Sequence, residues 1–192
     1  MIPCRAAWLV PLLLVALLLT ACGDAGSVQW RDATVQVPEG WTVFEEEETR
    51  LSMSNVQLGQ DADISPDDIP DGDIVAVFFT HEPGTTPGKW REFIEGREDH
   101  EIESDQSIEI DGVPATQFIY RHRSGSEMTR EMAVVVPARE IEIFAQPVPE
   151  PGDPDGPETF MRHFDTFREV VESIEWGAPL DLQSHGAGAA PR

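Results

Sequence analysis

Hydrophobic and polar residues alternate along much of the first half of the chain, which is the pattern of half-buried β-strands. The alternation covers residues 35–37 and 41–43, on either side of the turn signal Pro38-Glu39-Gly40, and it returns at 51–53. Residues 74–80 are apolar on both faces, which indicates a central strand. The first half therefore predicts four short strands, the first two of them joined by a tight turn.

The second half contains four further segments with the composition of strands. Residues 107–124 predict two strands joined by Asp111-Gly112, a dipeptide that is preferred in tight hairpins. Residues 127–148 predict two more, interrupted near Pro137-Ala138. The chain thus predicts about seven or eight strands, mostly antiparallel, because short turns join neighbouring strands that run in opposite directions.

A short middle helix is expected between these two groups of strands. Residues 86–98 begin with Thr86, which is suited to the N-cap, and Pro87, which is suited to the first helical position. The apolar residues on one side of this segment are Trp90, Phe93 and Ile94. The spacing of these residues predicts a helix that packs through that side.

Residues 159–176 have the clearest helical pattern, a single apolar stripe that recurs at spacings of four and three residues. The members of the stripe are Phe160, Phe164, Phe167, Val171 and Ile174. Asp155 and Glu158 resemble a capping box at the start, and Gly177 and Pro179 follow the end. An amphipathic helix must cover an apolar surface, and the sheet is the only large one, so we expect an α+β sandwich.

The N-terminus has the order of an export leader. A start carrying Arg5 precedes an apolar run over 6–19, which is shorter than the roughly 20 residues of a membrane span and contains Pro11. The run ends at Leu19-Thr20-Ala21-Cys22, which resembles the lipobox of bacterial lipoproteins. A plain signal peptide would need small residues at the cut but no cysteine. The resemblance implies cleavage before Cys22, lipid on its sulfur, and anchoring to the outer face of the cell membrane, or to the outer membrane if the organism has one.

These features divide the chain into four segments. We expect a lipoprotein signal peptide at 1–21 and a flexible tether at 22–29. One folded domain is expected at 30–177, followed by a disordered tail at 178–192.

The chain is strongly acidic, with 13 basic residues, 36 acidic residues and a formal net charge of −23. Cleavage before Cys22 removes Arg5 and makes the charge one unit more negative. Such a protein is a poor match for nucleic-acid phosphates and for anionic lipid heads, so we expect membrane contact through the lipid on Cys22. Cys4 leaves with the leader, and neither a disulfide nor a cofactor is expected.

The order of these motifs resembles the PsbP-like (Mog-type) family over residues 30–176. The matching positions are Pro38, Gly40 and Trp41 at the first turn, Asp111, Gly112 and Ala115 at the hairpin, and Phe167, Ser173 and Ile174 near the end. The resemblance implies an α/β/α sandwich and a role as a binding or assembly factor. The family has no shared catalytic residues, so the resemblance implies no active site.

One strand region concentrates positive charge in this acidic chain. Arg121 and Arg123 should share a face of a strand, and Arg130 falls on the next strand. The three arginines could hold a carboxylate or phosphate of a partner. Alternatively, they pair with acidic residues of neighbouring strands, which is the commoner arrangement. The histidines have no H-x3-H spacing and are expected to be surface or half-buried residues; they are His81, His100, His122, His163 and His185.

Two acidic loops are candidates for weak calcium binding. The first contains Asp61, Asp63, Asp67, Asp71 and Asp73, and the second contains Asp153, Asp155 and Glu158. Pro66 falls where an EF-hand loop that begins at Asp61 needs glycine, which favours a solvated acidic loop over an EF-hand.

No motif places a nucleophile, a base and an orienting group within reach of one another. The chain has no G-x-S-x-G motif and no phosphate-binding glycine loop. We therefore expect a non-enzymatic module that binds an unknown envelope protein or ligand at the membrane surface. Two alternatives remain open, a calcium-dependent form of this module and an enzyme whose groups converge from distant positions.

Overall fold

The structure is a computed structural model that describes residues 26–56, 73–124, 127–147 and 156–178. Within these ranges the chain forms ten strands, two α-helices and one 3-10 turn. The strands are β1 (Ser27–Trp30), β2 (Ala33–Gln36), β3 (Thr42–Glu46), β4 (Arg50–Ser54), β5 (Val75–His81), β6 (His100–Ile110), β7 (Val113–Ser124), β8 (Glu127–Val136), β9 (Ile141–Pro147) and β10 (Glu175–Trp176). The helices are α1 (Pro87–Glu95) and α2 (Gly156–Glu172), and the 3-10 turn η2 is Pro137–Arg139.

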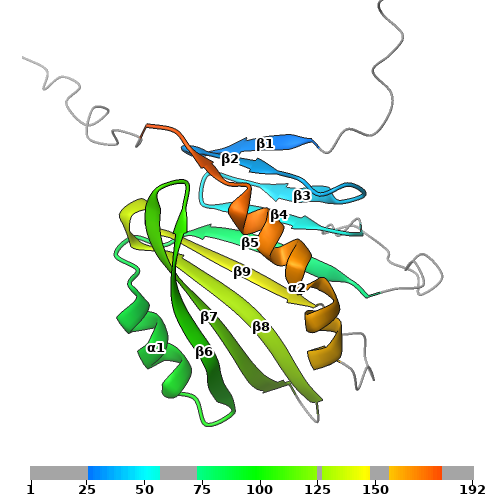
Figure 1. Ribbon diagram of the computed structural model, residues 1–192, viewed down its shortest axis with the longest axis vertical. Coiled ribbons are helices and arrows are strands. Elements are labelled where there is room, and N and C mark those ends of the chain that lie inside the picture. Colours follow the sequence, from blue (N-terminus) through cyan, green and yellow to red (C-terminus); the bar gives the residue numbers. More distant parts are fainter. Residues whose placement is uncertain (1–25, 57–72, 125–126, 148–155, 179–192) are drawn as a thin grey trace, which may run out of the picture.

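Seven strands form one antiparallel sheet in the order β3-β4-β5-β9-β8-β7-β6. The small sheet β1-β2-β10 lies beyond β3, at the top of Figure 1. The hairpin of β6 and β7 turns at Asp111 and Gly112, which both have positive φ, as a type I′ turn requires. This hairpin was expected from the sequence and is confirmed.

The two helices cover opposite faces of the large sheet. On β8, Met132 and Val134 belong to the core that contains α2, whereas Ala133 and Val135 belong to the core that contains α1. Successive side chains of a strand point to opposite faces, so this alternation places one helix on each side. The α+β class and the α/β/α arrangement expected from the sequence are therefore confirmed. Figure 1 shows α2 lying across the sheet, where it contacts β8 and β9.

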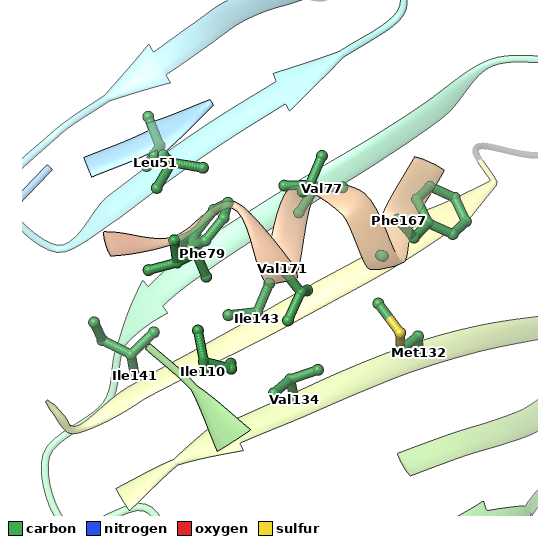
Figure 2. Packing of buried hydrophobic residues seen from close by; sticks show 14 of the residues in the cluster. Leu51, Val77, Phe79, Ile110, Met132, Val134, Ile141, Ile143, Phe167 and Val171 are labelled. Carbon is green, nitrogen blue, oxygen red and sulfur yellow. The ribbon is translucent and has the colours of Figure 1, made fainter. Parts of the chain in front are cut away.

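The α2 side contains the main hydrophobic core. Figure 2 shows Phe167 and Val171 of α2 among strand residues such as Phe79 and Ile143. Full burial of a Phe or Ile side chain contributes roughly 1.5–3 kcal/mol, so this stripe fixes α2 on the sheet. Neither helix of the described ranges is both long and apolar enough to cross a membrane.

The α1 side is smaller and covers one end of the opposite face. Thr86 accepts a hydrogen bond from the backbone N–H of Lys89, and Pro87 occupies the first turn. The cap and the short helix expected here are therefore confirmed. Trp90 and Ile94 are the residues that α1 buries against the sheet.

The last helix, which was expected over 159–176, ends four residues before its expected end. It ends at Glu172, Ile174 is buried just after it, and Trp176 is part of β10. The backbone N–H of Trp176 donates to a carboxylate oxygen of Asp111 over 2.8 Å, and β10 pairs with β2. These contacts with distant segments outweigh the local helical period.

The first expected turn also differs from the structure. The segments before and after Pro38-Glu39-Gly40 were expected to be adjacent strands, but β2 belongs to the small sheet and β3 to the large one. The small sheet begins at Ser27, so residues 27–29 of the expected tether form part of a strand. The expected signal peptide at 1–21 lies outside the described residues.

Candidate functional site

A cleft of about 670 Å³ opens between α1 and the face of the sheet that it partly covers. The helix covers only one end of this face, so side chains of β9 and of the β6–β7 hairpin remain accessible beside it. The lining residues are Glu82, Pro83, Gly84, Thr85, Lys89, Trp90, Phe93, Arg97, His100, Tyr120, His122, Glu131, Glu142, Phe144 and Gln146. A volume of this size fits a small organic molecule.

Aromatic rings form the walls of the cleft. Trp90 of α1 lies with its ring centroid 5.2 Å from that of Phe144 and 6.0 Å from that of Tyr120. Phe93, the next apolar residue of the helix, lies 5.3 Å from Trp90 and is 48% exposed. Trp90 is itself buried, so it forms a fixed wall, whereas Phe93 lies at the mouth.

Glu131 is the centre of a hydrogen-bonded network at one end of the cleft. One carboxylate oxygen accepts the hydroxyl of Tyr120 over 2.5 Å, and the other lies 2.7 Å from Nε2 of His122. The hydrogen bond to Glu131 raises the pKa of His122 above its usual value, in spite of partial burial. Burial, reinforced by the charge of Glu131, raises the pKa of the Tyr120 phenol well above its usual range.

His100 completes this end of the cleft. Its ring stacks on that of His122 with centroids 4.8 Å apart and planes 15° from parallel. The two residues are register partners on β6 and β7. Nδ1 of His100 lies 2.8 Å from a carboxylate oxygen of Asp99, so each ring of the stack has its own carboxylate partner.

The other end of the cleft carries polar groups of β9. Glu142, Phe144 and Gln146 alternate with fully buried residues and therefore point to the same face. Glu142 is half-buried and accepts a hydrogen bond from the hydroxyl of Thr85. Among the described residues no cation pairs with Glu142, and no side chain is hydrogen-bonded to the amide of Gln146. This end of the cleft therefore offers unused polar groups beside aromatic rings.

The arginines predicted as a binding region lie on the opposite face of β7 and β8. Arg121 and Arg130 are register partners, as expected for neighbouring strands. Arg121 donates to Glu101 and Arg130 donates to Glu103. These contacts match the alternative prediction, in which the arginines pair with acidic residues of neighbouring strands. Arg123 and Arg121 both line a smaller hollow of about 430 Å³. Their role in binding a partner stays a prediction.

The first predicted calcium loop meets the described structure only at Asp73. Both carboxylate oxygens of Asp73 accept hydrogen bonds from Arg162, over 2.7 and 2.9 Å, and these bonds lower the pKa of Asp73. Thr159 and His163 also lie within hydrogen-bond distance of it. The other predicted positions of this loop, Asp61, Asp63, Asp67 and Asp71, lie outside the described residues.

The second predicted loop has only Glu158 within the described part of the chain; Asp153 and Asp155 fall outside it. Over the described ranges, no three His, Cys, Asp or Glu side chains gather in a way that could hold a metal ion. Calcium binding stays a prediction.

The sequence did not indicate the cleft. The histidines were expected to be surface or half-buried, and Trp90 was expected on the packing side of the middle helix; His100 and His122 are half-buried and Trp90 is buried. Their convergence depends on the pairing of β6 with β7 and on the position of α1, neither of which leaves a local motif. The N-cap at Thr86 is the one local signal that bears on the cleft, because it fixes where α1 begins.

Comparison with known proteins gives similarities of overall fold. No protein-family model matches the sequence, and no curated protein matches it. Cyanobacterial PsbP (CyanoP) from Synechocystis sp. PCC 6803 is 15% identical, with a TM-score of 0.49 over 82% of this chain and 98% of that chain. A protein of unknown function from Pseudomonas aeruginosa is 11% identical, with a TM-score of 0.46 over 88% and 99% of the two chains.

Proposed function

We propose that the protein is an exported, lipid-anchored binding module that holds a small ligand in the cleft beside α1 and performs no catalysis. The observation that carries this proposal is the cleft itself, a hollow with aromatic walls and polar groups at both ends. Ligand pockets commonly combine apolar walls with a few such polar groups. The arginine region on the opposite face is a second contact surface for a partner.

The polar groups of the cleft favour binding over catalysis. Glu131 already accepts from Tyr120 and His122, so these three groups satisfy one another. The described residues that line the cleft include neither serine nor cysteine, and the hydroxyl of Thr85 is buried and donates to Glu142. A nucleophilic mechanism needs a free nucleophile next to a base, and this arrangement offers none.

The lipid on Cys22 would hold this module at the membrane. Two or three acyl chains anchor a protein stably, since each buried CH₂ contributes about 0.8 kcal/mol. Cys22→Ser should therefore move the protein out of the membrane fraction. Retention of this variant in membranes after a high-salt wash would show that something other than the lipid anchors the chain.

The cleft is tested by isolating the full-length protein from its native envelope and identifying small molecules that co-purify with it. A Gln146→Trp variant should lose the ligand, because a bulky ring at this half-buried position fills the cleft. The matched control is Gln106→Trp, on an exposed position of β6 away from the cleft, which should keep it. A wild-type protein that carries no ligand, and binds none from an envelope extract by ligand-observed NMR, contradicts the proposal. Equal recovery from both variants contradicts it as well.

A further inference from the structure

We infer that the ligand of this cleft is an organic cation, an apolar or aromatic molecule whose protonated amine pairs with Glu142. This inference rests on the proposed binding function and adds the chemical class of the ligand. It follows from three features of the cleft, namely an uncompensated carboxylate, cations that are engaged elsewhere, and aromatic rings beside the carboxylate.

Glu142 is the uncompensated carboxylate. It is half-buried on β9, and its hydrogen-bonding partner is the neutral hydroxyl of Thr85. A partly buried charge is costly unless an opposite charge compensates it. Glu131, the other half-buried carboxylate of the cleft, differs because the His122 imidazole pairs with it. A ligand that brings a positive charge to Glu142 would supply the missing partner.

Among the described residues that line the cleft, the two strong bases make their contacts with groups other than Glu142. Nζ of Lys89 donates to the backbone carbonyl of Gly84 over 2.6 Å. The guanidinium of Arg97 lies over the ring of Phe93, 4.2 Å from its centroid. Both cationic side chains belong to exposed residues at the rim. Glu142 therefore has no cationic partner among the described residues, in a protein whose formal net charge is −23.

Aromatic rings stand where the body of such a ligand would lie. Phe144 follows Glu142 on the same face of β9, and the ring of Trp90 packs 5.2 Å from it. Cations bind the faces of Trp and Phe rings, and an apolar body gains from the same surfaces. Gln146 is the next residue on that face, and its amide can pair with a polar group of the ligand. Four residues of strand place the Cα atoms of Glu142 and Gln146 about 13 Å apart, with Phe144 between them on the same face.

The test compares three probes of one shape on the full-length protein by isothermal titration calorimetry. They are 2-phenylethylammonium, neutral 2-phenylethanol and anionic 3-phenylpropanoate. The cation should bind about tenfold more tightly than the neutral probe and more tightly still than the anion. Glu142→Gln keeps an acceptor for Thr85 and removes the charge, so it should abolish the preference while leaving the affinity for 2-phenylethanol within about twofold. Glu109→Gln, on an exposed position of β6 outside the cleft, is the matched control and should change nothing.

A second measurement needs no variant. Raising the salt concentration should weaken binding of the cation and leave the neutral probe unaffected, because ions screen a partly exposed charge pair. Equal affinities for the cationic and the neutral probe would overturn the cation inference while leaving the cleft as a binding site. If Gln146→Trp binds the cation as well as wild type does, the probe lies elsewhere and the inference fails. Absence of binding by every probe also overturns it, whereas the proposed function is judged by the ligand that co-purifies.

Discussion

Nε2 of His122 lies 2.7 Å from a carboxylate oxygen of Glu131, across neighbouring strands and at one end of the cleft. The groups around this pair are the Tyr120 hydroxyl on the same carboxylate, the stacked ring of His100, and Asp99 on the far side of that stack. Hydrogen bonding to Glu131 is the main reason that the pKa of His122 is raised, and the negative charges of Glu131 and Asp99 add to it. The folded state therefore binds the His122 proton more tightly than the unfolded chain does.

This difference makes the stability of the protein depend on pH. The contribution of His122 is fully present below its unfolded pKa of about 6.5 and is lost as the pH rises through the raised folded pKa. His122→Gln should therefore reduce the free energy of unfolding most below about pH 6.5. An NMR titration should place the His122 midpoint above that value, and Glu131→Gln should lower it. Glu109→Gln, at an exposed position of β6 outside the cleft, is the matched control and should leave the His122 midpoint unchanged. An unchanged His122 midpoint in Glu131→Gln would show that Glu131 is not the cause.

Phe167 is the residue of α2 on which we expect the fold to depend most. Its side chain is fully buried, with its ring centroid 5.7 Å from that of Phe160. Phe167→Ala should lower the free energy of unfolding by about 3–5 kcal/mol, the usual cost of removing a buried Phe. Met161 lies on the same helix but is 53% exposed, so Met161→Ala should stay within about 0.5 kcal/mol of wild type. Urea denaturation measures both, and similar losses would mean that α2 is not held by its apolar stripe.

The local elements of the fold were predictable because each has a signal within a few residues. Thr86 and Pro87 mark the start of α1, and the spacing of Phe160 and Phe167 marks the buried side of α2. The end of α2 was not predictable in the same way. Trp176 continues the helical pattern in the sequence, but its backbone bonds to Asp111, which is far away along the chain.

The histidine end of the candidate site was not predictable, because the stack of His100 on His122 depends on one irregularity in the β6–β7 hairpin. The turn sets Ile110 opposite Val113, and uninterrupted pairing from there would place Glu101 opposite His122. A bulge between Ile102 and Ser104 shifts the register by one residue and brings His100 there instead. A shift of one residue exchanges the faces of a strand, so the histidine stack exists only because of the bulge. The pattern of polar and apolar residues in β6 does not predict this bulge.

The turn that starts this register offers its own test. Gly112 has φ of +76°, a conformation that costs a residue with a Cβ about 1–2 kcal/mol. Gly112→Ala should lower the free energy of unfolding by that amount, although its Cβ would meet no neighbouring atom. Gly88→Ala in the first turn of α1 is the control, because a helical position tolerates alanine and should gain a few tenths to about 1 kcal/mol. Equal effects of the two substitutions would mean that the positive φ is not the cause.

The arginines of β7 and β8 lie on the face of the sheet opposite the cleft. Arg121 and Arg130 face one another across β7 and β8, and Glu103 lies within ion-pair distance of both. Among the described residues no acidic side chain pairs with Arg123, which lies beside Arg121 in the hollow at the sheet edge. Arg123 is therefore available to pair with an acidic group of a partner, whereas Arg121 already pairs with Glu101.

Replacing Arg121 and Arg123 together with alanine should leave the protein folded, because both side chains belong to exposed residues and exposed ion pairs contribute little to stability. The double variant should lose a partner that wild type captures from the envelope at low salt and releases at high salt, since the Debye length falls as salt rises. The matched control replaces Arg91 and Arg168 with alanine; Arg91 pairs with Glu95 of α1 and Asp105 of β6, Arg168 pairs with Glu172 of α2, and both arginines lie outside the hollow. Cross-linking followed by mass spectrometry measures the capture. A partner retained equally by both double variants would show that Arg121 and Arg123 are not where the protein meets it.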